Sequence, residues 1–145
     1  IDREIRTESN SDGMRKTMDL VRQSDAEFIF TNLVDFDSKY GHRNDAPGYA
    51  RALETFDEEL EALLAALRQD DLLFITADHG CDPTDVSTDH TREYVPLLVA
   101  GPRISAARDL GTRRTFADLG ATICDYLGIP PDGFPGKSAL PELQR

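Results

Sequence analysis

Three histidines, each close behind an aspartate, are the residues of this chain best suited to chemistry. Asp37 lies shortly before His42, Asp78 directly precedes His79, and His90 also follows an aspartate. None of the three lies in an apolar stretch, where a histidine of the hydrophobic core would be expected. One such histidine could simply be a surface residue bonded to a carboxylate. Three of them in one chain favour a metal site.

The candidate ligands supply carboxylate oxygens and imidazole nitrogens. They are Asp37, His42, Asp78, His79 and His90. Such a set suits Mn, Zn or Fe, and the carboxylates favour the harder ion Mn. Five ligands are more than one catalytic ion normally takes from a protein, so two ions are expected. Two ions about 4 Å apart can hold the attacking and leaving oxygens at phosphorus, which points to phosphoryl transfer.

Cysteine adds little to this set. Cys81 follows Asp78 closely and could approach a metal, but we favour plain packing for it. Cys81 and Cys124 are too few for a disulfide framework and form no CxxC unit. We therefore expect both thiols to be free.

The charge balance limits the possible partners. The 145 residues include 27 acidic and 16 basic side chains, for a net charge of -11. This charge repels a phosphate backbone and argues against nucleic acid as a partner. It would also repel a phosphorylated substrate unless bound cations reversed the local field. An acidic enzyme acting on phosphates therefore requires its metals.

Length and hydropathy predict one compact domain in the cytoplasm. The chain is long enough for a hydrophobic core. No apolar stretch approaches the roughly 20 residues that span a bilayer, and the charged N-terminus does not resemble a signal peptide. We expect no membrane partner. The first residue is Ile1, and the opening residues read like the middle of a longer protein.

Strands and helices are expected to alternate along the chain. The predicted helices span residues 10–23, 46–69 and 115–127, and the predicted strands span residues 27–34, 72–77 and 95–100. Pairing of the last strand should begin after Pro96, and residues 130–145 should form a loop. This order predicts an α/β fold with a largely parallel sheet. The candidate ligands then follow the carboxyl ends of strands, where such sheets bind ligands.

Three segments of the chain strongly resemble phosphopentomutases, a family of the alkaline phosphatase superfamily. The segments are residues 32–43, 76–84 and 88–96, and the resemblance runs from about Arg6 to Lys137. The Asp-His-Gly sequence at residues 78–80 would be weak alone, since cofactor-independent phosphoglycerate mutases share it. The continuation through Thr84 and the run that ends at Pro96 narrow the match.

The resemblance implies a reaction and a division of the ligands. Asp37, His42 and His90 would hold one manganese ion, while Asp78 and His79 would contribute to a second. Members of the family are isomerases of nucleoside salvage. They interconvert ribose 1-phosphate and ribose 5-phosphate, and the corresponding deoxyribose pair. They do so through a phosphorylated threonine and a bisphosphate intermediate.

Some parts of the family pattern have no counterpart here. The first strand with a further metal-binding aspartate, the nucleophilic threonine and the cap domain would lie upstream of Ile1. Residues 1–145 would then be the C-terminal portion of the metal-binding core of an alkaline phosphatase-like fold, with no catalytic nucleophile of its own. We expect such a piece to be inactive and to associate through an exposed sheet edge.

Two alternative functions stay open from the sequence. One is another two-metal enzyme of the same superfamily, a phosphoglycerate mutase or a phosphatase. The other is a noncatalytic fragment that only binds metal.

Overall fold

The computed structural model describes residues 1–104, 107–130 and 132–144. Its main elements are α1 (Asn10–Gln23), α2 (Ala46–Ala66), β1 (Leu73–Thr76), β2 (Leu97–Ala100), α3 (Ala117–Tyr126) and α4 (Leu140–Leu143). Two short turns, η1 (Phe36–Tyr40, π-helical) and η2 (Gly41–Arg43, 3₁₀), lie between α1 and α2. Among the described residues no helix is long and apolar enough to cross a membrane.

Helix α1 has the bounds that the sequence predicts. Ser9 caps it, and its Oγ accepts the backbone N–H of Asp12 at 3.1 Å. Met14 is buried on the inner face, while the carboxylate of Asp12 binds Arg15 and Lys16 on the outer face. The helix thus follows the expected amphipathic pattern.

Helix α2 begins where predicted and ends three residues earlier, at Ala66 rather than Gln69. Asp45 caps it by accepting the N–H of Gly48 at 2.9 Å. Leu67 is already extended, so residues 67–69 leave the helix. α2 packs beside α1. The ring centroid of Tyr49 on α2 lies 5.6 Å from that of Phe36 on η1. This contact holds η1 against α2.

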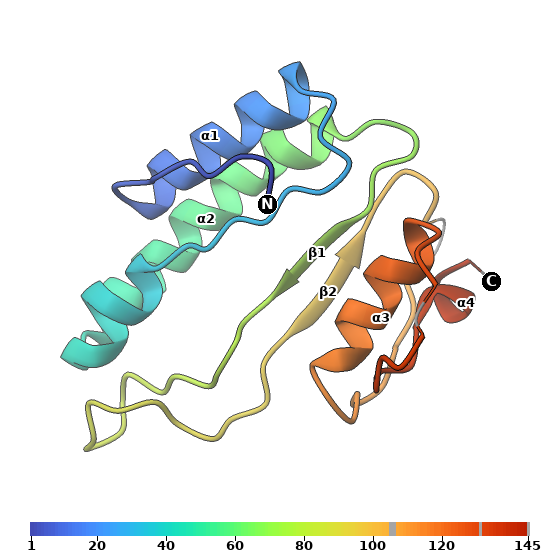
Figure 1. The fold of residues 1–145 in the computed structure, drawn as a ribbon. Coiled ribbons are helices and arrows are strands. Elements are labelled where there is room, and N and C mark those ends of the chain that lie inside the picture. Colours follow the sequence, from blue (N-terminus) through green and yellow to red (C-terminus); the bar gives the residue numbers. More distant parts are fainter. Residues whose placement is uncertain (105–106, 131, 145) are drawn as a thin grey trace.

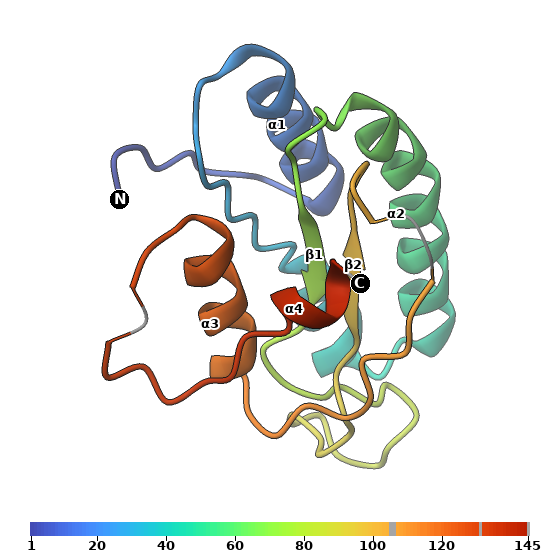
Figure 2. The same cartoon turned by 90° about the vertical axis from the view of Figure 1, so that its right-hand side faces the viewer.

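In the described part of the chain, two strands form the sheet. β1 and β2 pair antiparallel, with Leu73 opposite Ala100 and Thr76 opposite Leu97. Pairing begins after Pro96, as predicted. Figures 1 and 2 place α2 and α3 on opposite sides of these strands, an α/β arrangement. The α/β class is confirmed, whereas the expected parallel pairing is not found in the described sheet.

The strand predicted at residues 27–34 does not form among the described residues. The segment is extended and runs beside β1 (light blue in Figure 1), but it joins no sheet among the described residues. One side faces α1, where the hydroxyls of Thr31 and Thr17 lie 2.6 Å apart. On the other side, Phe28 and Phe30 are 56% and 79% exposed. Without a neighbouring strand, the backbone N–H and C=O groups of this segment cannot form the hydrogen bonds that a sheet provides.

Helix α3 spans Ala117–Tyr126 rather than residues 115–127, and α3 and the C-terminal tail differ from prediction in two further details. The spacing of Thr115 and Asp118 in the sequence is that of a capping box, but no such box forms, and the Asp118 carboxylate instead accepts the N–H of Lys137 at 2.8 Å. The tail is not all loop, since it contains α4, whose Leu140 and Leu143 are buried. Polar bonds from α3 thus dock the tail and bury its leucines.

Candidate metal centre

Asp37 lies at the centre of the candidate site, on the π-helical turn η1 that follows the extended segment. Its Oδ1 atom is buried, and among the described residues no donor bonds to it. A buried carboxylate oxygen without a partner is costly. This oxygen therefore suits a cation.

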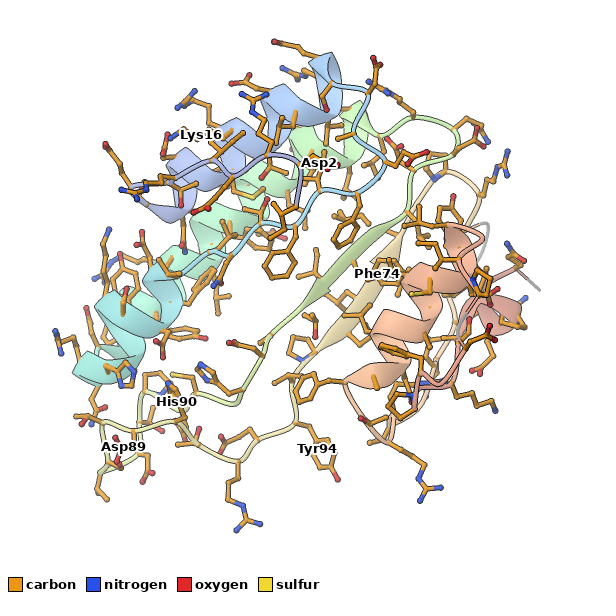
Figure 3. The ribbon with its side chains drawn as sticks, viewed as in Figure 1. Asp2, Lys16, Phe74, Asp89, His90 and Tyr94 are labelled. Atoms are coloured by element: carbon orange, nitrogen blue, oxygen red, sulfur yellow. The ribbon has the colours of Figure 1, made fainter. Side chains whose placement is uncertain are left out.

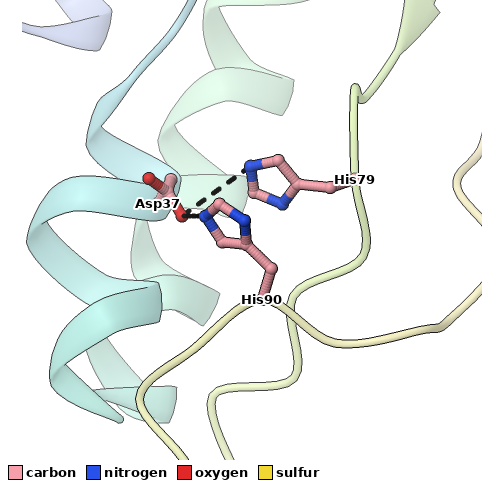
Figure 4. A group of neighbouring side chains, drawn as sticks. All are labelled: Asp37, His79 and His90. Atoms are coloured by element: carbon pink, nitrogen blue, oxygen red, sulfur yellow. Dashed lines mark ion pairs between the residues drawn. The ribbon is translucent and has the colours of Figure 1, made fainter.

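Three imidazole rings surround the same oxygen. The Nε2 atoms of His42 and His90 lie 3.4 Å from Asp37 Oδ1, and that of His79 lies 3.9 Å away. The His79 and His90 rings stack with centroids 3.6 Å apart. Figure 4 shows both rings turned toward Asp37. Atoms of Asp37, His79 and His90 that could bind one ion lie within 4.8 Å of one another.

Backbone carbonyls orient two of the rings. His42 Nδ1 lies 2.5 Å from the carbonyl oxygen of Thr88, and His79 Nδ1 lies 3.0 Å from that of Gly80. A ring that donates its Nδ1–H to a carbonyl keeps the lone pair on Nε2 for a metal. In both rings Nε2 is the atom that faces Asp37.

The loop between the strands closes through one backbone bridge. Gly80 pairs with Thr91, whose N–H bonds to the Gly80 carbonyl at 3.1 Å. The Thr91 hydroxyl also accepts the N–H of Asp82 at 2.8 Å. A Cβ on Gly80 would lie 2.7 Å from the Thr91 carbonyl oxygen. Only glycine permits this close approach. It holds together the two parts of the loop that carry His79 and His90.

The fifth predicted ligand, Asp78, lies at the rim. Its Oδ1 is 3.6 Å from His79 Nε2, and its side chain is 85% exposed. The structure thus brings His42, His79 and His90 around Asp37 Oδ1 and leaves Asp78 at the solvent side. The loop that carries His90 appears at the lower left of Figure 3, with Asp89 beside it.

Cys81 packs against this site. A Cβ on Gly41 would meet its Sγ atom, which places the thiol beside the turn that carries Asp37. Burial, together with the negative charge of Asp37, raises the pKa of the Cys81 thiol.

This donor set fits a divalent cation. Two ligand atoms that share one ion lie about 3.0–3.4 Å apart when each is about 2.1 Å from it. The separation of Asp37 Oδ1 from His42 and His90 Nε2 is 3.4 Å.

A family model described as the metalloenzyme superfamily matches residues 3–131. The chain belongs to the metalloenzyme superfamily.

Individual relatives narrow the position within this superfamily. Phosphopentomutase of Kosmotoga olearia is 58% identical over 127 residues, which cover 88% of this chain and 33% of the relative. Phosphopentomutase of Anaeromyxobacter sp. (strain K) is 55% identical over 145 residues, covering 100% and 37%. That of Thermotoga maritima is 57% identical over 127 residues, covering 87% and 33%. The chain spans about a third of the length of these curated relatives.

Sequence reasoning did not identify the residues that support the ligands. The Thr88 carbonyl, which faces His42, is a backbone group that no residue type reveals. Asp35, whose carboxylate accepts the N–H of Asn10, looks in the sequence like one more acidic residue of the segment. An isolated glycine directly after a candidate ligand, as at Gly80, was the one available signal.

Proposed function

We propose that the intact protein is a phosphopentomutase that interconverts ribose 1-phosphate and ribose 5-phosphate, and the deoxyribose pair, with two Mn²⁺ ions. The observation that carries this proposal is the convergence of three histidine rings on the unpartnered Asp37 Oδ1. The identity of 55–58% to proteins named phosphopentomutase supports the substrate class.

In this proposal Asp37, His42 and His90 hold one ion, and Asp78 with His79 contributes to the other. When bound, the two ions would neutralise phosphate charge and favour phosphoryl transfer. The Thr88 and Gly80 carbonyls keep Nε2 of His42 and His79 directed at the site. The net charge of -11 makes cations necessary for a phosphate to approach.

The catalytic threonine is proposed to come from an upstream segment of the intact protein, together with a cap domain. Residues 1–145 would then be the C-terminal portion of the catalytic core. The exposed rings of Phe28 and Phe30, on an extended segment with no strand neighbour in the described residues, support pairing with a further strand at this edge. Without that strand, the same edge would cause self-association.

We also propose that the protein works in the cytoplasm. Cys81 and Cys124 are both free, which fits a reducing compartment. Fractionation of cells that express a tagged intact protein would test this location.

The activity is tested on the intact protein loaded with Mn²⁺. We expect conversion of ribose 1-phosphate to ribose 5-phosphate, no turnover of 3-phosphoglycerate, and loss of at least about 10²-fold in rate for Asp37→Asn. The matched control is Asp57→Asn, on the exposed part of α2. Turnover of 3-phosphoglycerate instead of the pentose phosphate would contradict the substrate class. Full activity of Asp37→Asn would contradict the role of the site.

A further inference from the structure

We propose that Asn10 and Asp35 form a clamp that positions the metal-binding turn of Asp37. The two residues bond reciprocally between the start of α1 and the start of η1. The Asp35 carboxylate accepts the N–H of Asn10 at 2.9 Å, and the Asn10 side-chain oxygen accepts the N–H of Asp35 at 2.9 Å. Two bonds between the same residues fix both position and orientation.

The clamp acts on both sides of Asp37. Asp35 Oδ2 binds the N–H of Asn10 and also the ammonium group of Lys39, 3.0 Å away. Asp35 precedes the ligand in the chain and Lys39 follows it. The single turn that carries Asp37 is therefore held at each end by one carboxylate, which is itself anchored to α1.

Burial makes this anchor rigid. Asp35 is 8% exposed, a low value for a charged residue. The Asn10 Nδ2 atom is buried, and among the described residues it finds no acceptor. An amide orientation that leaves its own NH₂ unpaired costs free energy. The opposite orientation of the amide would place the Asn10 NH₂ group against the N–H of Asp35, donor against donor. The observed orientation is therefore the one that satisfies the Asp35 N–H.

The consequence lies at the metal centre. Asp37 Oδ1 must stay close to three rings carried by other segments. η1 is a short π-helical turn with no side-chain cap of its own, so it has little intrinsic stability. Fixing its start to α1 keeps Asp37 near the histidines. Asn10 and Asp35 are thus positioning residues, and the first residue of α1 is linked mechanically to the metal site.

This inference rests on the metal site of the proposed function, and its test uses Mn²⁺ binding rather than turnover. Binding to the intact protein is measured from the loss of the electron paramagnetic resonance signal of free Mn²⁺. We expect Asn10→Ala to weaken binding about tenfold. Ser9→Ala is the matched control, because it removes the α1 cap without touching Asp35. Its affinity should change less than twofold.

A charge-neutral exchange provides the rescue. In the double variant Asn10→Asp with Asp35→Asn, each side chain still offers an oxygen to the partner's N–H. We expect its Mn²⁺ affinity to stay within about threefold of the wild type. Unchanged affinity in Asn10→Ala, equal loss in Ser9→Ala, or no rescue by the exchange would each overturn the clamp. Failure of the wild type to bind Mn²⁺ would instead overturn the metal site itself.

Discussion

Asp37 Oδ1 and His90 Nε2 lie 3.4 Å apart, although Asp37 lies on η1 and His90 on the loop between β1 and β2. The oxygen has no hydrogen-bond donor among the described residues, so the approach is not an ordinary aspartate–histidine bond. The spacing matches two ligands that share one ion. His42 Nε2 lies at the same distance from the oxygen. The donor atoms are therefore spaced to share one cation.

Removal of one ring should weaken metal binding. His90→Ala leaves Asp37 with fewer neutral nitrogen ligands around the same ion, so we expect Mn²⁺ affinity of the intact protein to fall at least about tenfold. Asp89→Asn, at the exposed neighbouring position, is the control and should bind almost normally. Calorimetric titration measures both. Equal weakening by Asp89→Asn would mean that general negative charge, not the ring, holds the ion.

The bridge between Gly80 and Thr91 gives a steric prediction. A methyl group on Gly80 would lie 2.7–2.9 Å from backbone atoms of Thr91 and Glu93, which cannot rotate away. We expect Gly80→Ala to separate His79 from His90 and to weaken Mn²⁺ binding about tenfold. Val86→Ala changes the same loop where the side chain is 98% exposed and should have no effect. Normal metal affinity of Gly80→Ala would show that this bridge does not set the ring positions.

The buried hydroxyl of Thr122 gives a prediction about stability. It donates to the Asp118 carbonyl at 2.7 Å and accepts the N–H of Ala139 at 2.9 Å. Thr122→Val keeps the shape but leaves that N–H unsatisfied, so the free energy of unfolding should fall by about 1–3 kcal/mol. Thr122→Ser keeps the hydroxyl and should lose less. Urea denaturation of the intact protein compares them, and equal losses would exclude the hydrogen bond as the cause.

Asp118 should make the docking of the C-terminal tail sensitive to acid. The N–H of Lys137 lowers the pKa of the Asp118 carboxyl below its usual value, with a further contribution from the Arg113 charge. A lowered pKa in the folded state stabilises the fold above the unfolded value of about 3.9. That stability is lost as the pH falls below about 4, through the folded pKa.

The measurement is urea unfolding at several values between about pH 6 and pH 3. In Asp118→Asn the side-chain oxygen still accepts the N–H of Lys137 but no longer titrates. The variant should therefore lose less stability than the wild type over this range. An identical pH dependence in both proteins would show that Asp118 does not contribute to it.

Local rules predicted the three longer helices, α1, α2 and α3, but not α4. α1 follows from its apolar spacing and its cap, which involve neighbouring residues only. The start of α2 also agrees with prediction, and in the structure Asp45 and Pro47 account for it through effects local to the helix terminus. The two short strands were also found, because apolar runs bounded by polar loops indicate them. Their antiparallel pairing was not, since pairing joins residues far apart in the chain.

The segment at residues 27–34 marks the limit of such rules. Its composition indicates a buried strand, yet burial and pairing depend on a neighbouring strand rather than on the segment itself. Phe30 is exposed for that reason, while Thr31, on the opposite side, contacts α1. The tail shows the reverse effect, because Leu140 and Leu143 are buried by contacts that Asp118 and Thr122 set up from α3.

By itself, the sequence determined the donor types, the acidic net charge, and the helices that carry the loops. The tertiary structure decided which donors meet. It placed Asp37 among the three rings, left Asp78 at the rim, and anchored the turn through Asn10 and Asp35. The reason is physical: residue type fixes what an atom can bind, whereas distances between segments depend on packing and backbone bonds across the whole chain.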